Sequence, residues 1–484
     1  MIKAVVVGGG VAGLAVALRL RSLRFHVTVC DNGPAMGGKM NRWEAHGFRF
    51  DTGPTLLTMP EVLRRLFADL GERLEDHLEL YPLDPHAEYV FADGFRLGVP
   101  ALWEKWVEAA RLVEPRDAAG LEKLREIGER IFLLSQETFF RGHPLVPLRL
   151  PPLRALRRFP LRHAWGNYAR TIEGMLRSDR LRRIYLRYPT YVGSSPYLCP
   201  ATLLVIPYLE HAFGVWRVKG GMYRIVEALL AVAAARGIER LSGVRVTGIE
   251  QREGSVRGVQ LDNGAPLAAD VVVYTGDAAE LPVLLGRTAH ASAADRSLSG
   301  LVILLGLPQK IAGLRPHAVF FSEDYREEFG CLFGERRFPR DPTVYVHAPD
   351  DETMAPPGGQ ALFLMANAPG DPSSRWDGEA VSAATERVFE RLERSGLGGL
   401  RQRAAFLEVW HPGRLQARYL APGGAIYGGN SHGARRAFLR PPNRVRRPRG
   451  LYCAGGSFHP GGGIPMVLLS AEITARLIER DWIA

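Results

Sequence analysis

Three glycines near the start of the chain, Gly8, Gly10 and Gly13, have the spacing of a turn that binds the pyrophosphate of a nucleotide. In such a turn the first glycine permits a tight bend, the second lets the backbone approach the phosphates, and the third lets the next helix pack closely on the strand. Asp31 follows where a carboxylate can bind ribose hydroxyl groups, and it argues against a nucleotide that carries a 2′-phosphate. This pattern predicts a dinucleotide-binding site.

The elements around these residues support that interpretation. Residues 5–7 (VVV) predict a short buried strand, an apolar helix follows Gly13, and a second strand (HVTVC) ends at Asp31. The anion is then expected at the N-terminus of the helix, where backbone N–H groups are free to bind it. A secretory signal is excluded because it needs an uninterrupted apolar helix, whereas glycines break this run and three arginines follow at once.

Two further glycine clusters indicate a ligand longer than a nicotinamide dinucleotide. Residues 37–39 (GGK) lie shortly after Asp31, and residues 461–463 (GGG) precede the last predicted helix. FAD would place its adenosine at Asp31, its pyrophosphate at the first helix with Lys39 as a further contact, and its isoalloxazine ring near the last helix. The dipole of that helix would stabilise negative charge on the reduced ring. We therefore expect FAD as the cofactor.

The composition sets further limits. The chain has 484 residues, of which 46% are hydrophobic and 23% charged, as expected for a globular protein with two or three domains. Its four cysteines lie far apart, without the spacing of a zinc site, an iron–sulfur cluster or a redox dithiol. We therefore expect no metal and a reducing, cytoplasmic environment. The apolar runs are too short for a membrane-spanning helix, and nothing in the sequence specifies an oligomeric state.

The net charge of +11 is unevenly distributed. No acidic residue occurs from Thr138 to Ile172, where leucine and aromatic residues alternate with arginines and prolines prevent one long helix. The arginines of this basic segment are Arg141, Arg149, Arg154, Arg157, Arg158, Arg162 and Arg170. So much leucine favours acidic lipid headgroups and acyl chains as partners over nucleic acid, and predicts peripheral binding to a membrane surface. The alternative is a solvated arginine-rich loop whose leucines face the core.

Changes of pattern along the chain predict an α/β fold with a discontinuous first domain. Residues 1–100, 216–290 and 416–484 are expected to form a Rossmann-like FAD-binding domain. Residues 101–215 are expected to be mostly helical, to face the membrane and to contact substrate. Residues 291–415 contain several strand patterns and one long helix, which predicts a second domain with a mixed sheet that carries the substrate site.

Longer stretches resemble one family, the bacterial-type phytoene desaturases and related carotenoid oxidoreductases among the amine-oxidase-like flavoproteins. The resemblance runs almost from end to end of the chain. Its main stretches are GGGVAGLAVAL, GGKMNRWEAHGFRFDTGPTLL, YPTYVGSSPYLCPATLLVIPYLE, GVWRVKGGMYRIVEAL and LYCAGGSFHPGGGIPMVLLSA. The last stretch is the most specific, because its histidine, proline and glycine pattern is uncommon in other flavoproteins.

The resemblance implies which residues contact FAD. Gly8, Gly10, Gly13 and Asp31 would contact the adenosine diphosphate, and the backbone of Val246 would contact adenine. The remaining flavin contacts would be Gly38, Lys39, Gly53, Gly455, Gly463, Ile464 and Met466.

The resemblance also implies the reaction, which is dehydrogenation of a carbon–carbon single bond in an acyclic carotenoid such as phytoene or a later polyene. A hydride goes to flavin N5 and a proton leaves the neighbouring carbon. The lipophilic substrate needs an apolar tunnel and a flavin face rather than a catalytic triad. The alternatives are a carotenoid terminal oxygenase or ketolase on the same scaffold and a non-enzymatic prenyl-lipid carrier. Intact glycine clusters at both ends of the cofactor path argue against the carrier.

No residue of the sequence is assigned as a catalytic acid or base. His459 is as well explained as a residue that shapes the glycine turn beside it, and Asp51, before Thr-Gly-Pro, as the cap of a turn. Three tyrosines, Tyr188, Tyr191 and Tyr197, could contact a polyene, although tyrosines at this spacing are usually part of the core.

Overall fold

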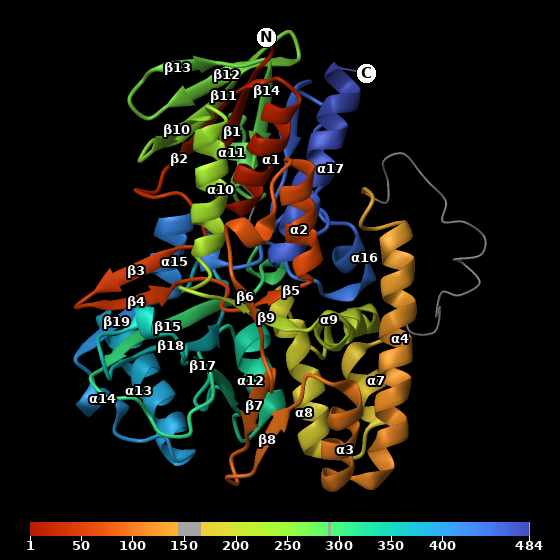
Figure 1. Ribbon diagram of the computed structural model, residues 1–484, viewed down its shortest axis with the longest axis vertical. Coiled ribbons are helices and arrows are strands. Elements are labelled where there is room, and N and C mark those ends of the chain that lie inside the picture. The colour runs from red at the N-terminus through yellow and green to blue at the C-terminus, as the bar shows by residue number, and fades with distance from the viewer. Residues whose placement is uncertain (144–165, 289–291, 484) are drawn as a thin grey trace.

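The computed structural model describes residues 1–143, 166–288 and 292–483 (Figure 1). Most of the basic segment predicted from the sequence, including Arg149, Arg154, Arg157, Arg158 and Arg162, lies outside the described residues. Within them, no helix has both the length and the apolar character needed to cross a membrane.

A five-stranded parallel sheet brings together three distant parts of the chain, in the order β10-β2-β1-β14-β20. The strands are β1 (Lys3–Val7), β2 (His26–Asp31), β10 (Glu239–Ser242), β14 (Val271–Tyr274) and β20 (Leu451–Cys453). Because all five run in the same direction, their carboxyl ends lie at one edge of the sheet, where ligands bind in open α/β folds. The glycine turn after β1 and Asp31 at the end of β2 therefore lie at that edge.

Both faces of this sheet are covered, which explains why its strands are almost uniformly apolar. Val6 packs on one face against the helices α1 (Val11–Ser22), α10 (Arg224–Ala235), α17 (Ile464–Trp482) and α2 (Pro60–Asp69). Val5 packs on the other face against an antiparallel meander of β11 (Val246–Arg252), β12 (Ser255–Leu261) and β13 (Pro266–Ala268). Figure 1 shows the three layers at one end of the molecule, with both termini nearby.

A seven-stranded sheet forms the second main layer, in the order β19-β15-β18-β17-β16-β7-β8, antiparallel except for the β16–β7 pair. Its strands are β7 (Ala87–Val90), β8 (Arg96–Val99), β15 (Ser299–Leu307), β16 (His317–Phe320), β17 (Val344–His347), β18 (Gln360–Ala368) and β19 (Phe406–Trp410). Helix α13 (Gly378–Arg394) covers one face, and the hairpin of β3 (Arg42–Ala45) and β4 (Phe48–Asp51) covers part of the other. The hairpin β7–β8 at the edge of this sheet belongs to residues 1–100, which the sequence analysis assigned wholly to the FAD-binding domain.

Helices dominate the described part of residues 101–215. They are α3 (Trp103–Val113), α4 (Ala118–Glu137), α7 (Tyr168–Met175), α8 (Asp179–Arg187) and α9 (Val205–Phe213), with single turns between them. They share one apolar core with the edge of the seven-stranded sheet. A small sheet of β5 (Leu57–Thr58), β9 (Val215–Val218) and β6 (Leu80–Pro82) connects this region to the first layer. The division of the chain into three domains remains a prediction.

The remaining short helices lie in connections. They are α11 (Leu281–Leu284), α12 (Tyr325–Phe329), α14 (Leu400–Arg403), α15 (Pro412–Tyr419) and α16 (Gly433–Phe438).

Helix α1 packs on β1 at a distance that only glycine permits. A Cβ atom on Gly13 would lie 1.9 Å from the carbonyl oxygen of Gly8. Gly8 itself has a left-handed φ of 107°. Thr275, after β14, donates to the carbonyls of Val7 and Gly8 at 3.0 and 2.9 Å and ties the turn to the middle of the sheet. Gly13 therefore acts on the cofactor site through helix packing.

We expect Gly13→Ala to destabilise the cofactor-free protein by about 1–3 kcal/mol, because the added methyl group forces α1 away from β1. Gly174→Ala is the matched control. Gly174 also lies inside a helix, α7, but a Cβ atom there meets nothing within 4 Å. The control should be neutral or stabilising by up to about 1 kcal/mol. Urea unfolding of the two variants measures the difference, and equal stabilities would show that α1 tolerates the methyl group.

Candidate functional site

A cavity of about 1110 Å³ extends from the carboxyl edge of the five-stranded sheet to the face of the seven-stranded sheet. Val7 and Tyr274 line it at one end, and Val302 and Phe363 line it at the other. Its volume exceeds the range of roughly 300–1,000 Å³ typical of a site for one small ligand. The cavity therefore has room for a dinucleotide and a second, apolar molecule.

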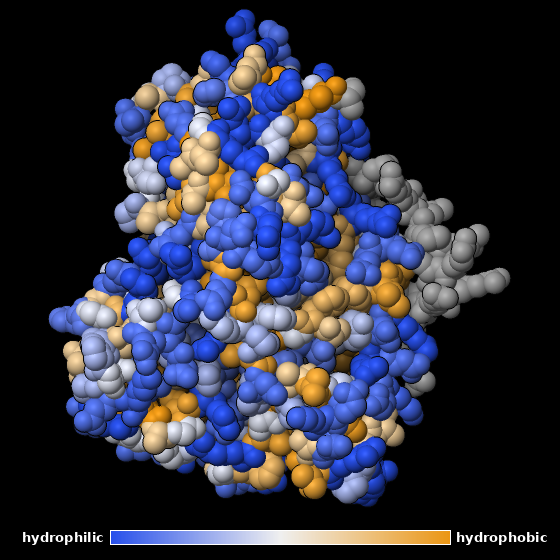
Figure 2. Space-filling model, viewed as in Figure 1, coloured by the Kyte–Doolittle hydropathy of each residue, from blue (hydrophilic) through white to orange (hydrophobic). Residues whose placement is uncertain are grey.

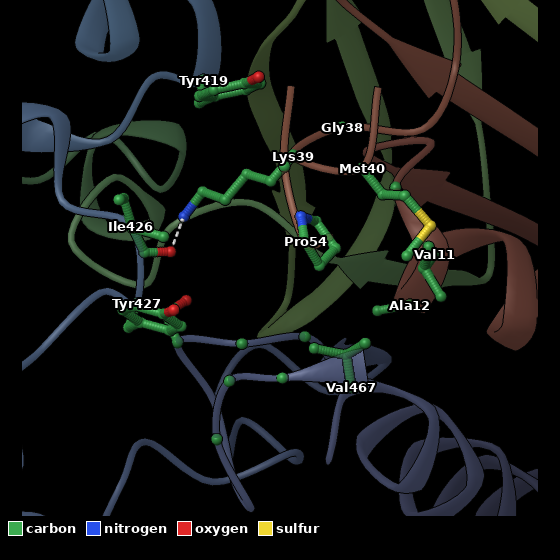
Figure 3. A pocket seen from close by; sticks show the side chains of 18 of the residues that line it. Val11, Ala12, Gly38, Lys39, Met40, Pro54, Tyr419, Ile426, Tyr427 and Val467 are labelled. Atoms are coloured by element: carbon green, nitrogen blue, oxygen red, sulfur yellow. Dashed lines mark hydrogen bonds between the residues drawn. The ribbon is translucent and has the colours of Figure 1, made fainter. Parts of the chain in front are cut away.

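Almost all residues that the sequence predicted for the cofactor site line this cavity. They are Gly8, Gly10, Asp31, Gly38, Lys39, Gly53, Val246, Gly455, Gly463, Ile464 and Met466. Gly13 does not line it and lies behind the turn, against Gly8. Segments more than four hundred residues apart thus meet around one space (Figure 3).

Two helix N-termini open into the cavity without a capping side chain. Gly10 precedes α1 and Gly463 precedes α17, and neither helix has a side-chain hydrogen bond at its first turn. A Cβ atom on Gly10 would come no closer than 3.8 Å to any neighbouring atom, and one on Gly463 would meet nothing within 4 Å. Free N–H groups and open space at a helix start suit a negatively charged ligand. These two positions fit a pyrophosphate and a ring that becomes negatively charged on reduction.

Asp31 is held by backbone groups at the edge of the sheet. Its Oδ2 accepts from the N–H of Gly9 at 2.6 Å, and its Oδ1 accepts from the N–H of Gly33 at 2.8 Å. Burial raises the pKa of this carboxyl, and the two N–H groups act in the opposite direction. Each oxygen keeps a second lone pair, so the fixed carboxylate can accept hydrogen bonds from ribose hydroxyl groups.

Lys39 extends across the cavity. Its Nζ donates to the carbonyl oxygen of Ile426 at 2.5 Å and to that of Ala425 at 3.3 Å (Figure 3). In the described part of the chain no carboxylate lies within 4.0 Å of this ammonium group, and burial lowers its pKa to about 8. The nearby carboxylate of Asp277 is already paired with Arg296 at 2.9 Å. Lys39 therefore places a positive charge at the cavity wall that an anionic ligand can neutralise.

The acid and base candidates from the sequence are engaged elsewhere. His459 is fully buried, its Nε2 lies 2.7 Å from the carbonyl oxygen of Phe139, and burial lowers its pKa to about 4. Asp51 accepts from the N–H groups of Met222 and Tyr223 at 2.8 and 3.1 Å. Neither side chain lines the large cavity. Both are explained by their backbone contacts, which position the segments around the cofactor site.

The tyrosines of the central segment differ in their positions. Tyr191 lines the cavity, whereas Tyr188 and Tyr197 do not. The structure adds cavity residues that the sequence analysis did not find, among them Arg187, Tyr345 and Tyr427. Arg187 ends α8 and Tyr191 lies in the YPTYV turn that follows, and only tertiary packing places both at the cavity.

The far part of the cavity is mainly apolar. Its wall includes Leu203, Ile206, Leu209, Val302, Val319, Phe363 and Met365. Among the described lining residues, the carboxylates are Asp31, Asp277 and Glu280, all at the edge of the five-stranded sheet or just beyond it. The arrangement can hold a charged dinucleotide at one end and a long apolar molecule at the other.

The fold and the site define a flavoprotein oxidoreductase. The sequence model of the family of flavin containing amine oxidoreductases matches residues 11–479, so the chain belongs to that family. Its cofactor is FAD, and the glycine turns, the uncapped helix starts and Asp31 fit this group. That the predicted residues contact FAD individually remains a prediction.

The relatives confirm the resemblance to carotenoid oxidoreductases. The chain is 31% identical to 4,4'-diapolycopene oxygenase of Methylomonas sp (99% of this chain, 98% of that protein). It is 34% identical to hydroxyneurosporene desaturase of Rubrivivax gelatinosus (98% and 93%) and 31% identical to 1-hydroxycarotenoid 3,4-desaturase of a Flavobacterium species (99% and 99%). An oxidoreductase structure from Methanosarcina mazei shares the fold, with a TM-score of 0.66 at 17% identity over 97% of this chain and 99% of that chain.

We expect Gly10→Ala to lose FAD while the cofactor-free protein keeps its stability. The free protein has space for the methyl group, but a bound pyrophosphate would approach the backbone at this position. The ratio of flavin to protein absorbance after reconstitution measures the loss, and urea unfolding without FAD measures stability. Full flavin occupancy in this variant would contradict the assignment of the turn.

Lys39 should make the stability of the cofactor-free protein depend on pH. Lysine in an unfolded chain titrates near pH 10.4, but burial lowers the pKa of Lys39 to about 8. Below pH 8 the folded state must hold a buried charge, so the free energy of unfolding should rise as the pH rises from about 7.5 to about 9.5. The gain relative to Lys39→Met should reach up to about 2 kcal/mol. Parallel pH profiles for the two proteins would contradict a buried ammonium group.

Proposed function

We propose that the protein is an FAD-dependent oxidoreductase that dehydrogenates a carbon–carbon single bond of an acyclic carotenoid. The observation that carries this proposal is the continuity of the cavity, which joins a dinucleotide-binding edge to a long apolar chamber. The relatives named above are, by their names, carotenoid desaturases and a carotenoid-type oxygenase. An apolar chamber suits a polyene, which offers no charge for a site to bind.

The residues of the chamber would orient the polyene and exclude water. When bound, FAD accepts the hydride that leaves one carbon of the substrate. The neighbouring carbon loses a proton, and the electron pair of that C–H bond forms the new double bond. Apolar side chains such as Val302 and Phe363 would keep water away from the reacting carbons.

Tyr345 is a hydrogen-bonding residue of the cavity wall rather than a base, because burial raises the pKa of its hydroxyl above the usual range. It lines the cavity, and its hydroxyl lies 2.6 Å from both Thr55 Oγ1 and His317 Nδ1. Burial holds the pKa of His317 well below its usual range, so this histidine stays neutral beside the hydroxyl. His317 and Asp351 line a small cavity of about 20 Å³ beyond, which is large enough for one water molecule.

Peripheral membrane binding fits a substrate that dissolves in lipid. The cavity reaches Phe139 and Phe140, at the start of the basic segment, Leu203 just before α9, and Ile206 on α9. Figure 2 shows hydrophobic side chains gathered on the visible face where α9 lies, within a mostly hydrophilic surface. We propose that the helical region of residues 101–215 faces the membrane there and that the polyene enters the cavity directly from lipid. Transfer through water would cost about 0.8 kcal/mol for each CH₂ group exposed.

A terminal carotenoid oxygenase is the second candidate, since one of the relatives is named 4,4'-diapolycopene oxygenase. Both reactions use the same chamber, and the product distinguishes them.

FAD-loaded protein supplied with an acyclic carotenoid in liposomes should lose its visible flavin absorbance when oxygen is absent. The product should lack two hydrogen atoms by mass spectrometry, whereas an oxygenase would form a heavier product only in air. A polyene that binds without bleaching the flavin would indicate a carrier and contradict the proposal. The Gly10→Ala protein serves as the flavin-deficient control.

A further inference from the structure

An arginine interrupts the apolar wall of the substrate chamber. Arg187, the last residue of α8, lines the cavity. Its guanidinium group lies over the rings of Tyr191, Tyr345 and Tyr89, at 5.0, 5.7 and 5.9 Å from their centres. These cation–π contacts hold the guanidinium group in place. They do not use its N–H donors, which lie in the plane of that group.

The hydrogen-bond capacity of Arg187 is largely unused within the protein. Its Nη1 donates to the hydroxyl of Tyr191 at 2.8 Å and more weakly to that of Tyr89 at 3.5 Å. Among the described residues, its Nε and Nη2 have no hydrogen-bond acceptor, and no carboxylate lies within 4.0 Å. The side chain is only half-buried although it lies deep in the protein, because part of its surface faces the cavity.

A carboxyl group behind the tyrosines balances the charge without contacting it. Glu210 on α9 is 4% exposed, and burial raises its pKa while the charge of Arg187 and hydrogen bonds from the hydroxyls of Tyr188 and Tyr191 oppose that effect. Tyr191 thus links the guanidinium to Glu210. Because Glu210 already balances the charge of Arg187, the free N–H donors suit a neutral acceptor atom better than a second carboxylate.

We propose that Arg187 binds an oxygen substituent, a hydroxyl or a carbonyl group, at one end of the polyene substrate. A hydrocarbon end would cover the free N–H groups and leave them without an acceptor, which is unfavourable in an apolar chamber. An oxygen atom at this position replaces the hydrogen bonds that the N–H groups lose when the substrate displaces water. Thr190 beside it adds a polar lining group. This inference rests on the proposed function and deepens it, because it specifies the substrate class.

The inference places the enzyme within a reaction sequence. A reaction that adds oxygen to the end of an acyclic polyene, by hydration of a terminal double bond or by oxygenation, must precede it. The enzyme then removes hydrogen from a molecule that already carries a polar end.

The test compares two acyclic polyenes of equal length, one a hydrocarbon and one with a terminal hydroxyl group, using FAD-loaded protein. The natural protein should show a higher kcat/KM and tighter binding for the hydroxylated polyene, with binding followed separately by quenching of tryptophan fluorescence. Arg187→Met should lower both values for the hydroxylated polyene by roughly 10- to 100-fold and leave the hydrocarbon almost unchanged. Arg187→Lys, which keeps the charge but loses the planar set of donors, should fall between.

Arg180→Met is the matched control, because Arg180 lies on the same helix but pairs with Asp93 at the surface and does not line the cavity. If the single variant fails to fold, Arg187→Met is combined with Glu210→Gln, which removes both buried charges. This double variant is expected to show the same loss of preference for the hydroxylated polyene. An unchanged preference in flavin-loaded Arg187 variants, or a natural preference for the hydrocarbon, would overturn the inference. If neither polyene is oxidised but the hydroxylated one still binds through Arg187, the proposed reaction fails and the binding site stands.

Discussion

The site depends on the close packing of α1 on β1, where Gly13 meets the carbonyl group of Gly8. This contact directs the N-terminus of α1 toward the carboxyl edge of the parallel sheet. Thr275 fixes the same turn to β14, a strand that the chain reaches only after more than two hundred further residues. The turn thus links local backbone geometry to the sheet that gathers the rest of the cofactor site.

Two of the cations on the cavity wall, Lys39 and Arg187, lie in chemically different parts of it. Lys39 is held by the carbonyl groups of Ile426 and Ala425, and Arg187 by the hydroxyl and the rings of tyrosines. In the described structure neither is paired with a carboxylate in direct contact. A buried cation without such a partner is unfavourable by itself, so each gains when a ligand supplies the missing acceptor. Lys39 suits the negative charge of the dinucleotide, and Arg187 suits a neutral oxygen atom.

The apolar character of the remaining wall limits the chemistry. His459 and Asp51, the acid and base candidates of the sequence, bind backbone groups and do not line the cavity. Deep burial keeps His459 neutral, so it serves packing. The protein therefore contributes position, exclusion of water and a few hydrogen bonds, and it leaves the electron transfer to the cofactor.

The sequence by itself determined the glycine turn, the acid at Asp31, the choice of FAD and the parallel sheet assembled from separated segments. These features follow from local rules, since a left-handed φ at Gly8 and an apolar strand before it restrict the backbone within a few residues. Only the tertiary structure showed that β7 and β8 join the second sheet and that Arg187 faces the substrate chamber. Those facts depend on contacts between segments far apart in the chain. The spacing of residues along a sequence does not specify which side chains will meet around one space.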